Sequence, residues 1–193
     1  MKRSTRIIVS IFILVSLIGL DHLTKWAAIH YLKGSGITYR FPGDIFRLQY
    51  AENTGAFLSL GAGLPDGLRA IVMTGLNAVI LGGLLCYLFL GKRVGGLSSF
   101  AFSLVAAGGI GNLIDRIFRD GRVVDFMNLG ITTGQFNLRT GIFNIADVAI
   151  MAGLFLVIAN EIFFLRKSGT PTTDDPDPKA EGSKQKKKAG EKR

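Results

Sequence analysis

The chain has 193 residues, of which 48% are hydrophobic, with a mean hydropathy of +0.36 and a formal charge of +9. This length favours one domain, and the hydropathy is too high for a soluble domain that also carries a lysine-rich end. The single cysteine, Cys86, excludes an internal disulfide bond. The composition therefore predicts a small membrane protein.

Four apolar stretches are long enough to cross a bilayer, which requires ~20 residues in a helix. They cover residues 6–20 with an extension towards Leu32, 68–90, 97–117 and 143–165. The basic start followed by an apolar run is also typical of a secretory signal peptide. No small-residue cleavage site follows residue 20, so we expect an uncleaved first span.

Clusters of basic residues separate these stretches and predict their orientation. The clusters are Lys2, Arg3 and Arg6 before the first stretch, Lys92 and Arg93 between the second and third, and Arg166 and Lys167 after the fourth. Basic residues accumulate on the cytoplasmic side of a membrane, so we expect both termini inside the cell and connections 33–67 and 118–142 outside. The second connection also contains basic residues, namely Arg119, Arg122 and Arg139, which weakens the bias.

The two external connections contain short patterns typical of β-strands. Residues 46–50 alternate between apolar and polar side chains, and Pro42-Gly43-Asp44 before them predicts a turn. Residues 123–124 and 135–138 are further candidate strands. We therefore expect an all-α membrane protein whose four transmembrane helices carry a small external β-sheet.

The composition changes after Lys167. Residues 168–193 contain proline, aspartate and a run of lysines, and such a segment cannot bury a core. We expect residues 1–167 to form the membrane domain and residues 168–193 to form a disordered, Lys-rich cytoplasmic tail. The tail either keeps this end soluble or contacts anionic headgroups, with each nearby Lys contributing about 1 kcal/mol.

Two aspartates at the edges of apolar segments are the candidates for chemistry. Asp125 lies between Val124 and Phe126, where a lone acid also suits a turn or a strand edge. Asn144 and Asp147 open the fourth stretch, where their spacing matches a helix N-cap with a capping box. Two close carboxyl groups share a proton because ionising both is costly, so one serves as a base and the other as an acid. We expect Asp147, at the helix N-terminus, to be the ionised member and Asp125 the protonated one.

Other polar residues lie near the same ends of the stretches. Asp21 and Lys25 are four residues apart, and this spacing predicts a helical ion pair. The segment Asn53-Thr54-Gly55-Ala56-Phe57 is on the expected outer side, where by itself it indicates no more than a turn.

The end of the third stretch is rich in glycine and ends in charged residues. Residues 108–111 permit close helix packing. Asn112 and Arg116 share a helix face because they are four residues apart. Arg116 is suited to an ion pair with Asp115, to snorkelling towards the membrane surface, or to a contact with a carboxylate, and the spacing alone does not choose.

Taken together, these motifs occur in a specific order. They are Asp21-x-x-Thr24-Lys25, Asn53-Thr54-Gly55-Ala56-Phe57, Gly111-Asn112-Leu113-Ile114-Asp115-Arg116, Val124-Asp125-Phe126 and Phe143-Asn144-Ile145-Ala146-Asp147. The order closely resembles the bacterial lipoprotein signal peptidase family, also called signal peptidase II, over residues 8–164. The Lys-rich tail is not part of the family's motifs.

The resemblance implies an aspartyl endopeptidase of the bacterial inner membrane that removes signal peptides from diacylglyceryl-modified prolipoproteins. Such an enzyme cuts before the lipidated cysteine at the outer face, needs no metal or cofactor, and is blocked by globomycin. Its fold is four transmembrane helices with a small external sheet and a short external helix. We expect a monomer whose partners are the lipidated substrate, membrane lipids and globomycin-type inhibitors, and not nucleic acid.

The resemblance also assigns residues to the site. Asp125 and Asp147 match the catalytic dyad. The positions that match residues lining or supporting the site are Asn53, Gly55, Gly108, Asn112, Arg116, Asn144 and Ala146. Asp21 and Lys25 match a polar pair that supports the first span.

From the residues alone, two other classes of protein remain open. A small four-span transporter or channel subunit would use Asp21, Asp115 and Asp147 as ion-coupling acids. Transporters place such groups nearer the bilayer midplane than the outer rim. A non-catalytic assembly factor would use the same motifs for helix packing.

Overall fold

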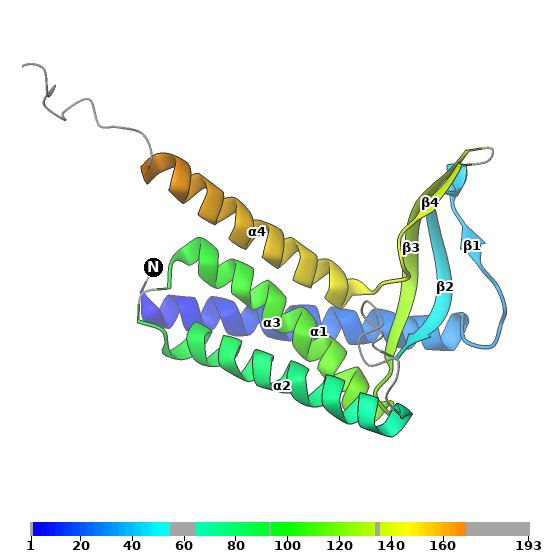
Figure 1. The fold of residues 1–193 in the computed structure, drawn as a ribbon, viewed down its shortest axis with the longest axis horizontal. Helices are drawn as coiled ribbons and strands as arrows, with labels where there is room; N and C mark the ends of the chain where they lie inside the picture. Colours follow the sequence, from blue (N-terminus) through cyan, green and yellow to red (C-terminus); the bar gives the residue numbers. More distant parts are fainter. Residues whose placement is uncertain (1, 55–64, 93, 134–135, 169–193) are drawn as a thin grey trace, which may run out of the picture. The chain divides into compact units, whose positions relative to one another are not determined.

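The computed structural model describes residues 2–54, 65–92, 94–133 and 136–168, which form four long helices and a small sheet (Figure 1). The helices are α1 (Arg3–Tyr31), α2 (Asp66–Leu90), α3 (Gly96–Phe118) and α4 (Ile145–Ser168). Each is long and apolar enough to cross a membrane, which confirms the predicted spans. Gly55 and the predicted tail from residue 169 onward lie outside the described residues.

The helices keep apolar faces exposed. The exposed fraction is 70% for Phe12 on α1, 74% for Val79 on α2 and 70% for Phe155 on α4. Exposing apolar surface to water costs about 25 cal/mol per Å². These faces are therefore suited to lipid chains, in agreement with the length of the helices.

The most enclosed helix is α3, which packs against α1 and α2. In the most apolar 18-residue segment of α3, 50% of the residues are buried, against 11–17% in the corresponding segments of the other helices. Its buried face includes many small residues, namely Ser99, Ala101, Ser103, Ala106, Ala107, Gly108, Gly109 and Gly111. Small side chains let helix backbones approach closely in lipid, where van der Waals contact drives association.

Arginine side chains join the start of α1 to the end of α2. Arg6 is 4% exposed, and its Nη2 donates a hydrogen bond to the Gly91 carbonyl at 2.7 Å. Nη2 of Arg3 donates to the Phe89 carbonyl at 3.3 Å. The last carbonyls of a helix lack intrahelical partners and attract positive charge. These basic residues lie at the end of α1 away from the sheet (Figure 1).

The sheet has four antiparallel strands in the order β1-β2-β3-β4 (Figure 1). The strands are β1 (Tyr39–Arg40), β2 (Phe46–Asn53), β3 (Val123–Thr133) and β4 (Phe136–Arg139). The strands predicted from residues 46–50 and 123–124 are thus present, and the described part of the third prediction, residues 136–138, lies in β4; residue 135 is outside the described residues. All three strands extend beyond the predicted limits. The predicted turn is the 3₁₀ helix η1 (Pro42–Asp44), the one short helix in the described part of the chain.

One face of the sheet packs on the end of α1. Val124 and Phe126 of β3 are buried there with Ala28 and Leu32 of α1. Successive side chains of a strand point to opposite faces, so burying these two residues directs Asp125 to the other face. The hydrophobic contact therefore fixes the direction of a candidate catalytic side chain.

The residues before α4 are joined to β3. The Phe143 N–H donates to the Met127 carbonyl at 2.8 Å, and its carbonyl accepts from the N–H groups of Met127 at 2.8 Å and Phe126 at 3.1 Å. This bridge places the N-terminus of α4 beside Asp125. Residues of α4 up to Ile158 belong to the same compact unit as the other helices and the sheet.

Candidate active site

Asp125 is held on β3 by two amide side chains. Nδ2 of Asn144 donates to its Oδ1 at 2.6 Å, and Nδ2 of Asn53 donates to its Oδ2 at 3.1 Å. The residue is 2% exposed. Burial, and next the negative charge of Asp147, raise the pKa of Asp125 to about 6, although the two amide hydrogen bonds oppose the shift. The Asp125 carboxyl thus favours its protonated form far more than an aspartate in water does.

Asp147 lies in the first turn of α4, where it forms the predicted capping box. Its backbone N–H donates to Oδ1 of Asn144 at 2.9 Å, and the Asn144 N–H donates to Oδ2 of Asp147 at 3.1 Å. Nδ2 of Asn112 donates to Oδ1 of Asp147 at 2.8 Å. Asp147 is less buried than Asp125, so its carboxylate has better access to water.

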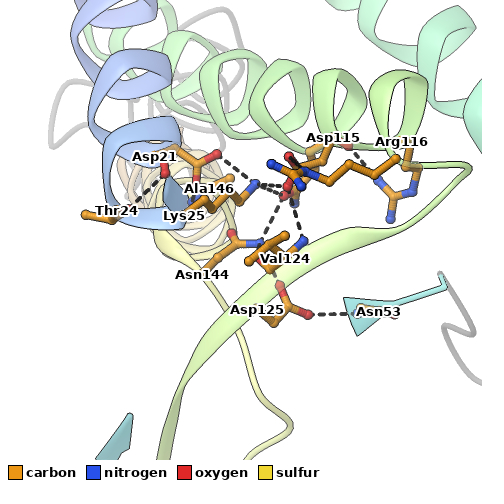
Figure 2. Close-up of polar contacts among 12 residues, drawn as sticks. Asp21, Thr24, Lys25, Asn53, Asp115, Arg116, Val124, Asp125, Asn144 and Ala146 are labelled. Carbon is orange, nitrogen blue, oxygen red and sulfur yellow. Dashed lines mark hydrogen bonds and ion pairs between the residues drawn. The ribbon is translucent and has the colours of Figure 1, made fainter. Parts of the chain in front are cut away.

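Asn144 connects the two carboxyl groups. It is fully buried, and it donates to Asp125 through its side chain and to Asp147 through its backbone. Figure 2 shows Asn144 between α1 and the strand that carries Asp125. The two aspartates, 22 positions apart in the sequence, are therefore brought to the same residue.

The amide of Asn112 has its orientation set by Lys25. Nζ of Lys25 donates to Oδ1 of Asn112 at 3.1 Å, and an ammonium group has donors only. The oxygen of Asn112 must therefore face Lys25, and its Nδ2 must face Asp147. Oδ1 of Asn112 also accepts from Nδ2 of Asn144 at 3.1 Å, so the amides form a continuous network.

Lys25 is the centre of a buried ion-pair group (Figure 2). Its Nζ lies 2.8 Å from Oδ2 of Asp21 and 2.9 Å from Oδ2 of Asp115. The side chains of all three residues are at most 2% exposed. Nε of Arg119 pairs with Oδ1 of Asp115 at 3.0 Å. We call Lys25, Asp21, Asp115 and Arg119 the lysine cluster; it contains the ion pair predicted from the spacing of Asp21 and Lys25.

The lysine cluster also binds the backbone around the two aspartates. Oδ1 of Asp21 accepts from the N–H of Ala146 at 2.9 Å, which is one of the first N–H groups of α4. Oδ2 of Asp115 accepts from the N–H of Val124 at 3.1 Å, next to Asp125. The cluster therefore positions both segments that carry the candidate catalytic carboxyl groups.

Asp115 was not among the site residues assigned from the sequence. It was considered only as a partner of Arg116 or as an ion-coupling acid, whereas its ion-pair partners in the structure are Lys25 and Arg119. The signal that could have identified it is an acidic residue within an apolar span, which is costly unless it is paired. Sequence could not supply its contact with Val124.

Gly108 and Gly111 let α3 approach the neighbouring helices. A Cβ atom at Gly108 would collide with the Ala146 carbonyl oxygen and lie 2.8 Å from Cγ1 of Ile150, both on α4. A Cβ atom at Gly111 would lie 2.7 Å from Oδ2 of Asp21 on α1. The predicted packing role of these glycines is confirmed, and it brings Asn112 within reach of both α1 and α4.

Arg116 lies in the last turn of α3, close enough to Asp147 and Asp125 to interact with their charges. Its Nη1 makes a long contact of 3.5 Å with the Asn112 carbonyl. Its Nε is buried and has no hydrogen-bond partner among the described residues. The sequence left three roles open for Arg116, and the structure favours the one near the carboxylates of Asp125 and Asp147.

Comparison with known proteins places this constellation in a family. Residues 13–163 match the family model described as signal peptidase (SPase) II. The chain is 42% identical over 152 residues to the lipoprotein signal peptidase of Chlorobium phaeovibrioides, which covers 76% of this chain and 86% of that protein. It is 35% identical over 155 residues to that of Borreliella burgdorferi, with 80% and 89% covered. The chain belongs to the signal peptidase II family.

Two solved structures of bacterial membrane enzymes are similar to the chain. A bacterial membrane enzyme determined by the in meso method at 2.3 Å resolution matches with a TM-score of 0.64 and 26% identity, covering 88% of this chain and 94% of that one. A second, at 1.9 Å resolution, matches with a TM-score of 0.62 and 28% identity, covering 79% and 91%. As a lipoprotein signal peptidase family member, the protein is a membrane protease that processes prolipoproteins.

Apart from Gly55, which lies outside the described residues, the residues that the sequence assigned to the signal peptidase II site are connected to one another. Hydrogen bonds, ion pairs or close backbone contacts join Asp21, Lys25, Asn53, Gly108, Asn112, Arg116, Asp125, Asn144, Ala146 and Asp147. Within the described residues, no group of three or more His, Cys, Asp and Glu side chains is arranged to hold a metal ion.

Proposed function

We propose that Asp125 and Asp147 are the catalytic pair of an aspartyl endopeptidase that cuts diacylglyceryl-modified prolipoproteins before the lipidated cysteine. The observation that carries this proposal is the position of Asn144, which donates a hydrogen bond to each carboxyl group. Family membership supports the substrate class, and the different surroundings of the two carboxyl groups support the division of roles.

Asp147 is assigned as the base. It accepts hydrogen bonds from Asn112 and from the Asn144 backbone at the N-terminus of α4, where the helix dipole favours negative charge. It is also the more accessible carboxyl group, so a water molecule can reach it. In the proposed reaction the water oxygen attacks the scissile carbonyl carbon while one water proton passes to Asp147.

Asp125 is assigned as the acid. Burial raises the pKa of Asp125 to about 6, so its carboxyl group holds a proton more readily than an ordinary aspartate does. In the proposed reaction this proton passes to the carbonyl oxygen as the tetrahedral intermediate forms. In the second step the proton taken by Asp147 passes to the amide nitrogen, the C–N bond breaks, and a hydroxyl proton returns to Asp125. The pair titrates as a unit, so these roles describe the favoured microstate.

Arg116 and Asn53 are proposed to support the substrate and the acid. Arg116 has a buried Nε without a partner among the described residues, and its guanidinium interacts with the charges of Asp125 and Asp147. A substrate carbonyl oxygen would satisfy the Nε. Asn53 holds Asp125 from β2, on the side opposite to Asn144.

The site is proposed to face the outer side of the inner membrane. Arg3 and Arg6 lie at the end of the unit opposite to the sheet, next to Gly91 at the start of the basic α2–α3 connection. Basic residues favour the cytoplasmic side, so the sheet and the aspartates fall on the outer side and both termini inside. We propose a monomer with the lipidated substrate, bilayer lipids and globomycin-type inhibitors as its partners.

The test is cleavage of a synthetic diacylglyceryl-modified prolipoprotein peptide by purified protein in detergent. Asp125→Asn and Asp147→Asn should each lower kcat by roughly 10²–10⁴-fold, the usual contribution of a general acid or base. Asp120→Asn, in the same connection as Asp125, is the control and should retain activity. Full activity in either dyad variant, with the fold verified by circular dichroism, would exclude the proposed mechanism.

A further inference from the structure

Glu52 lies next to Asn53 on β2 and accepts three hydrogen bonds. Its Oε1 accepts from the Tyr50 hydroxyl at 2.7 Å and from Nζ of Lys33 at 3.0 Å, and its Oε2 accepts from Nη1 of Arg122 at 2.9 Å. The donors belong to different segments: the connection after α1, β2 itself, and the residue before β3. One carboxylate therefore ties three parts of the chain together.

These contacts lie at the last pair of the β2–β3 ladder. Glu52 is opposite Val124, and Asn53 is opposite Val123, beyond which the described ladder has no further pair. Adjacent residues of a strand point to opposite faces, so Glu52 faces away from Asp125 while Asn53 faces towards it. Glu52 thus holds the strand end from the side that the catalytic carboxyl groups do not occupy.

The Glu52 carboxylate is charged across the neutral pH range. Hydrogen bonds from Tyr50, Arg122 and Lys33 lower its pKa to about 2. Nζ of Lys33 also lies 5.5 Å from the centre of the Tyr50 ring. Hydrogen bonds to an ionised acceptor are stronger than neutral ones, so the tie persists across the neutral range.

We propose that Glu52 is a positioning residue, whose bond to Arg122 keeps the end of β2 against β3 and so holds Nδ2 of Asn53 on Oδ2 of Asp125. This inference rests on the proposed role of Asp125 as the acid. Terminal strand pairs fray when nothing fixes them, and Asn53 is in the last pair of this ladder. Without the Glu52–Arg122 bond, the hydrogen bond from Asn53 to Asp125 is broken for part of the time.

The direction of a pKa change separates positioning from simple charge removal. Asn53 stabilises the ionised form of Asp125, so losing this contact raises the pKa of Asp125. Removing a negative charge at Glu52 by itself lowers that pKa. The other charged groups that face Asp125 are Asp147 on α4, Lys25 on α1 and Arg116 on α3, and Glu52→Gln changes none of them.

The experiment is the pH dependence of kcat and KM for Glu52→Gln on the lipidated peptide. We expect the upper limb of the kcat profile to move up by about 0.3–1 pH unit, because Asp125 holds its proton to higher pH. We also expect the maximum kcat to fall about 3–10-fold, because the acid is less well positioned, with KM nearly unchanged. In an Asn53→Ala background, Glu52→Gln should produce no further upward shift. A downward shift, or an equal upward shift in that background, would overturn the proposal.

Controls separate a general loss of fold from loss of positioning. Asp44→Asn removes a carboxylate that accepts from Nε of Arg47 at 2.7 Å near the other end of β2, and it should leave the profile unchanged. If Glu52→Gln does not fold, Tyr50→Phe, which removes one of the three bonds, should show a smaller shift in the same direction. No shift in a folded Tyr50→Phe protein would then count against the proposal.

An infrared titration makes the test independent of turnover. The Asp125 carboxyl band, identified by its absence in Asp125→Asn, should titrate at higher pH in Glu52→Gln than in the unmodified chain. If Asp125 is not the catalytic acid, Glu52→Gln leaves the cleavage activity unaffected, but the Asp125 band still titrates at higher pH. An unchanged band position and midpoint would refute the positioning role alone.

Discussion

Lys25 and Asn112 are joined by a hydrogen bond of 3.1 Å between Nζ and Oδ1, and this contact decides which end of the amide faces Asp147. A primary amide presents an acceptor on one side and donors on the other. A cation that occupies the acceptor side leaves Nδ2 directed at the carboxylate. Lys25 has no direct hydrogen bond to Asp147 in the described structure, and yet it determines which group of Asn112 binds the Asp147 carboxylate.

Replacing Lys25 should therefore be severe. Lys25→Met leaves Asp21 and Asp115 buried without their shared cation, and removing one partner of a buried pair costs about 3–5 kcal/mol. We expect the free energy of unfolding to fall by this amount in detergent, measured by denaturant titration. Lys33→Met is the control, because Lys33 is 52% exposed and water screens its pair with Glu52, so the loss should be much smaller. Equal losses of unfolding free energy in Lys25→Met and Lys33→Met would contradict the prediction that the buried lysine contributes more to stability than the exposed one.

Adding one methyl group to α3 should separate it from α4. In Gly108→Ala the new Cβ meets the Ala146 carbonyl oxygen, so α4 must shift, at a cost of about 1–3 kcal/mol and with loss of cleavage. Gly75→Ala on α2 is the matched control, since no atom lies within 4 Å of its added Cβ. It should keep activity and gain up to about 1 kcal/mol from helix propensity. Thermal unfolding and peptide cleavage measure both effects.

The burial of Asp125 predicts an inactive variant whose stability relative to the active protein rises with pH. The pKa of Asp125 rises from 3.8 in an unperturbed chain to about 6 in the fold, so the folded chain binds more protons between these values. The stability contributed by this group is present below pH 3.8 and is lost as the pH rises through 6. Asparagine does not ionise, although its Nδ2 would meet one of the two amide donors that bind Asp125. That cost is the same at every pH, so the unfolding free energy of Asp125→Asn relative to the unmodified chain should rise by on the order of 2–3 kcal/mol between pH 4 and pH 8.

Denaturant titrations of both proteins at pH 4, 6 and 8 measure this difference. A constant difference at all three values would mean that Asp125 ionises normally in the fold. Asp44→Asn provides a comparison of opposite sign, because hydrogen bonding to Arg47 lowers the pKa of Asp44.

The proposed topology predicts which positions react with a membrane-impermeant maleimide. In a Cys86→Ser background, which removes the exposed native cysteine, Arg40→Cys on β1 should label in intact spheroplasts. Lys92→Cys, in the α2–α3 connection, should label only after the membrane is permeabilised. Labelling of position 92 and protection of position 40 would reverse the orientation.

The elements and the pair of aspartates could be predicted from the sequence because their signals are local. Apolar length defines the helices, alternation defines β2, and the spacing of Asn144 and Asp147 defines a capping box. The role of Asp115 could not be predicted in this way. Its contacts with Lys25 and Val124 depend on how α1, α3 and β3 meet in space, and only Arg119 is close in sequence.

The same limit applies to Glu52. The sequence does not distinguish Glu52 from other acidic residues, and two of its three donors come from positions 19 residues before and 70 residues after it in the chain. The alternation predicts a strand only over residues 46–50 and a turn at Asn53, so it does not indicate which faces Glu52 and Asn53 occupy. What the sequence lacked was the register of β2 on β3, which places Asn53 at the end of the ladder.

The lysine cluster has a consequence for the electrical balance of the whole site. It contains two acidic and two basic side chains, so it is neutral as a group. Arg116 remains as a single positive charge that faces Asp125 and Asp147. The assembly is therefore electroneutral when the two carboxyl groups hold one proton between them, and it acquires a net charge if that proton leaves or a second one binds. At the edge of a low-dielectric bilayer, electroneutrality selects the singly protonated pair for reasons separate from the burial of either carboxyl group.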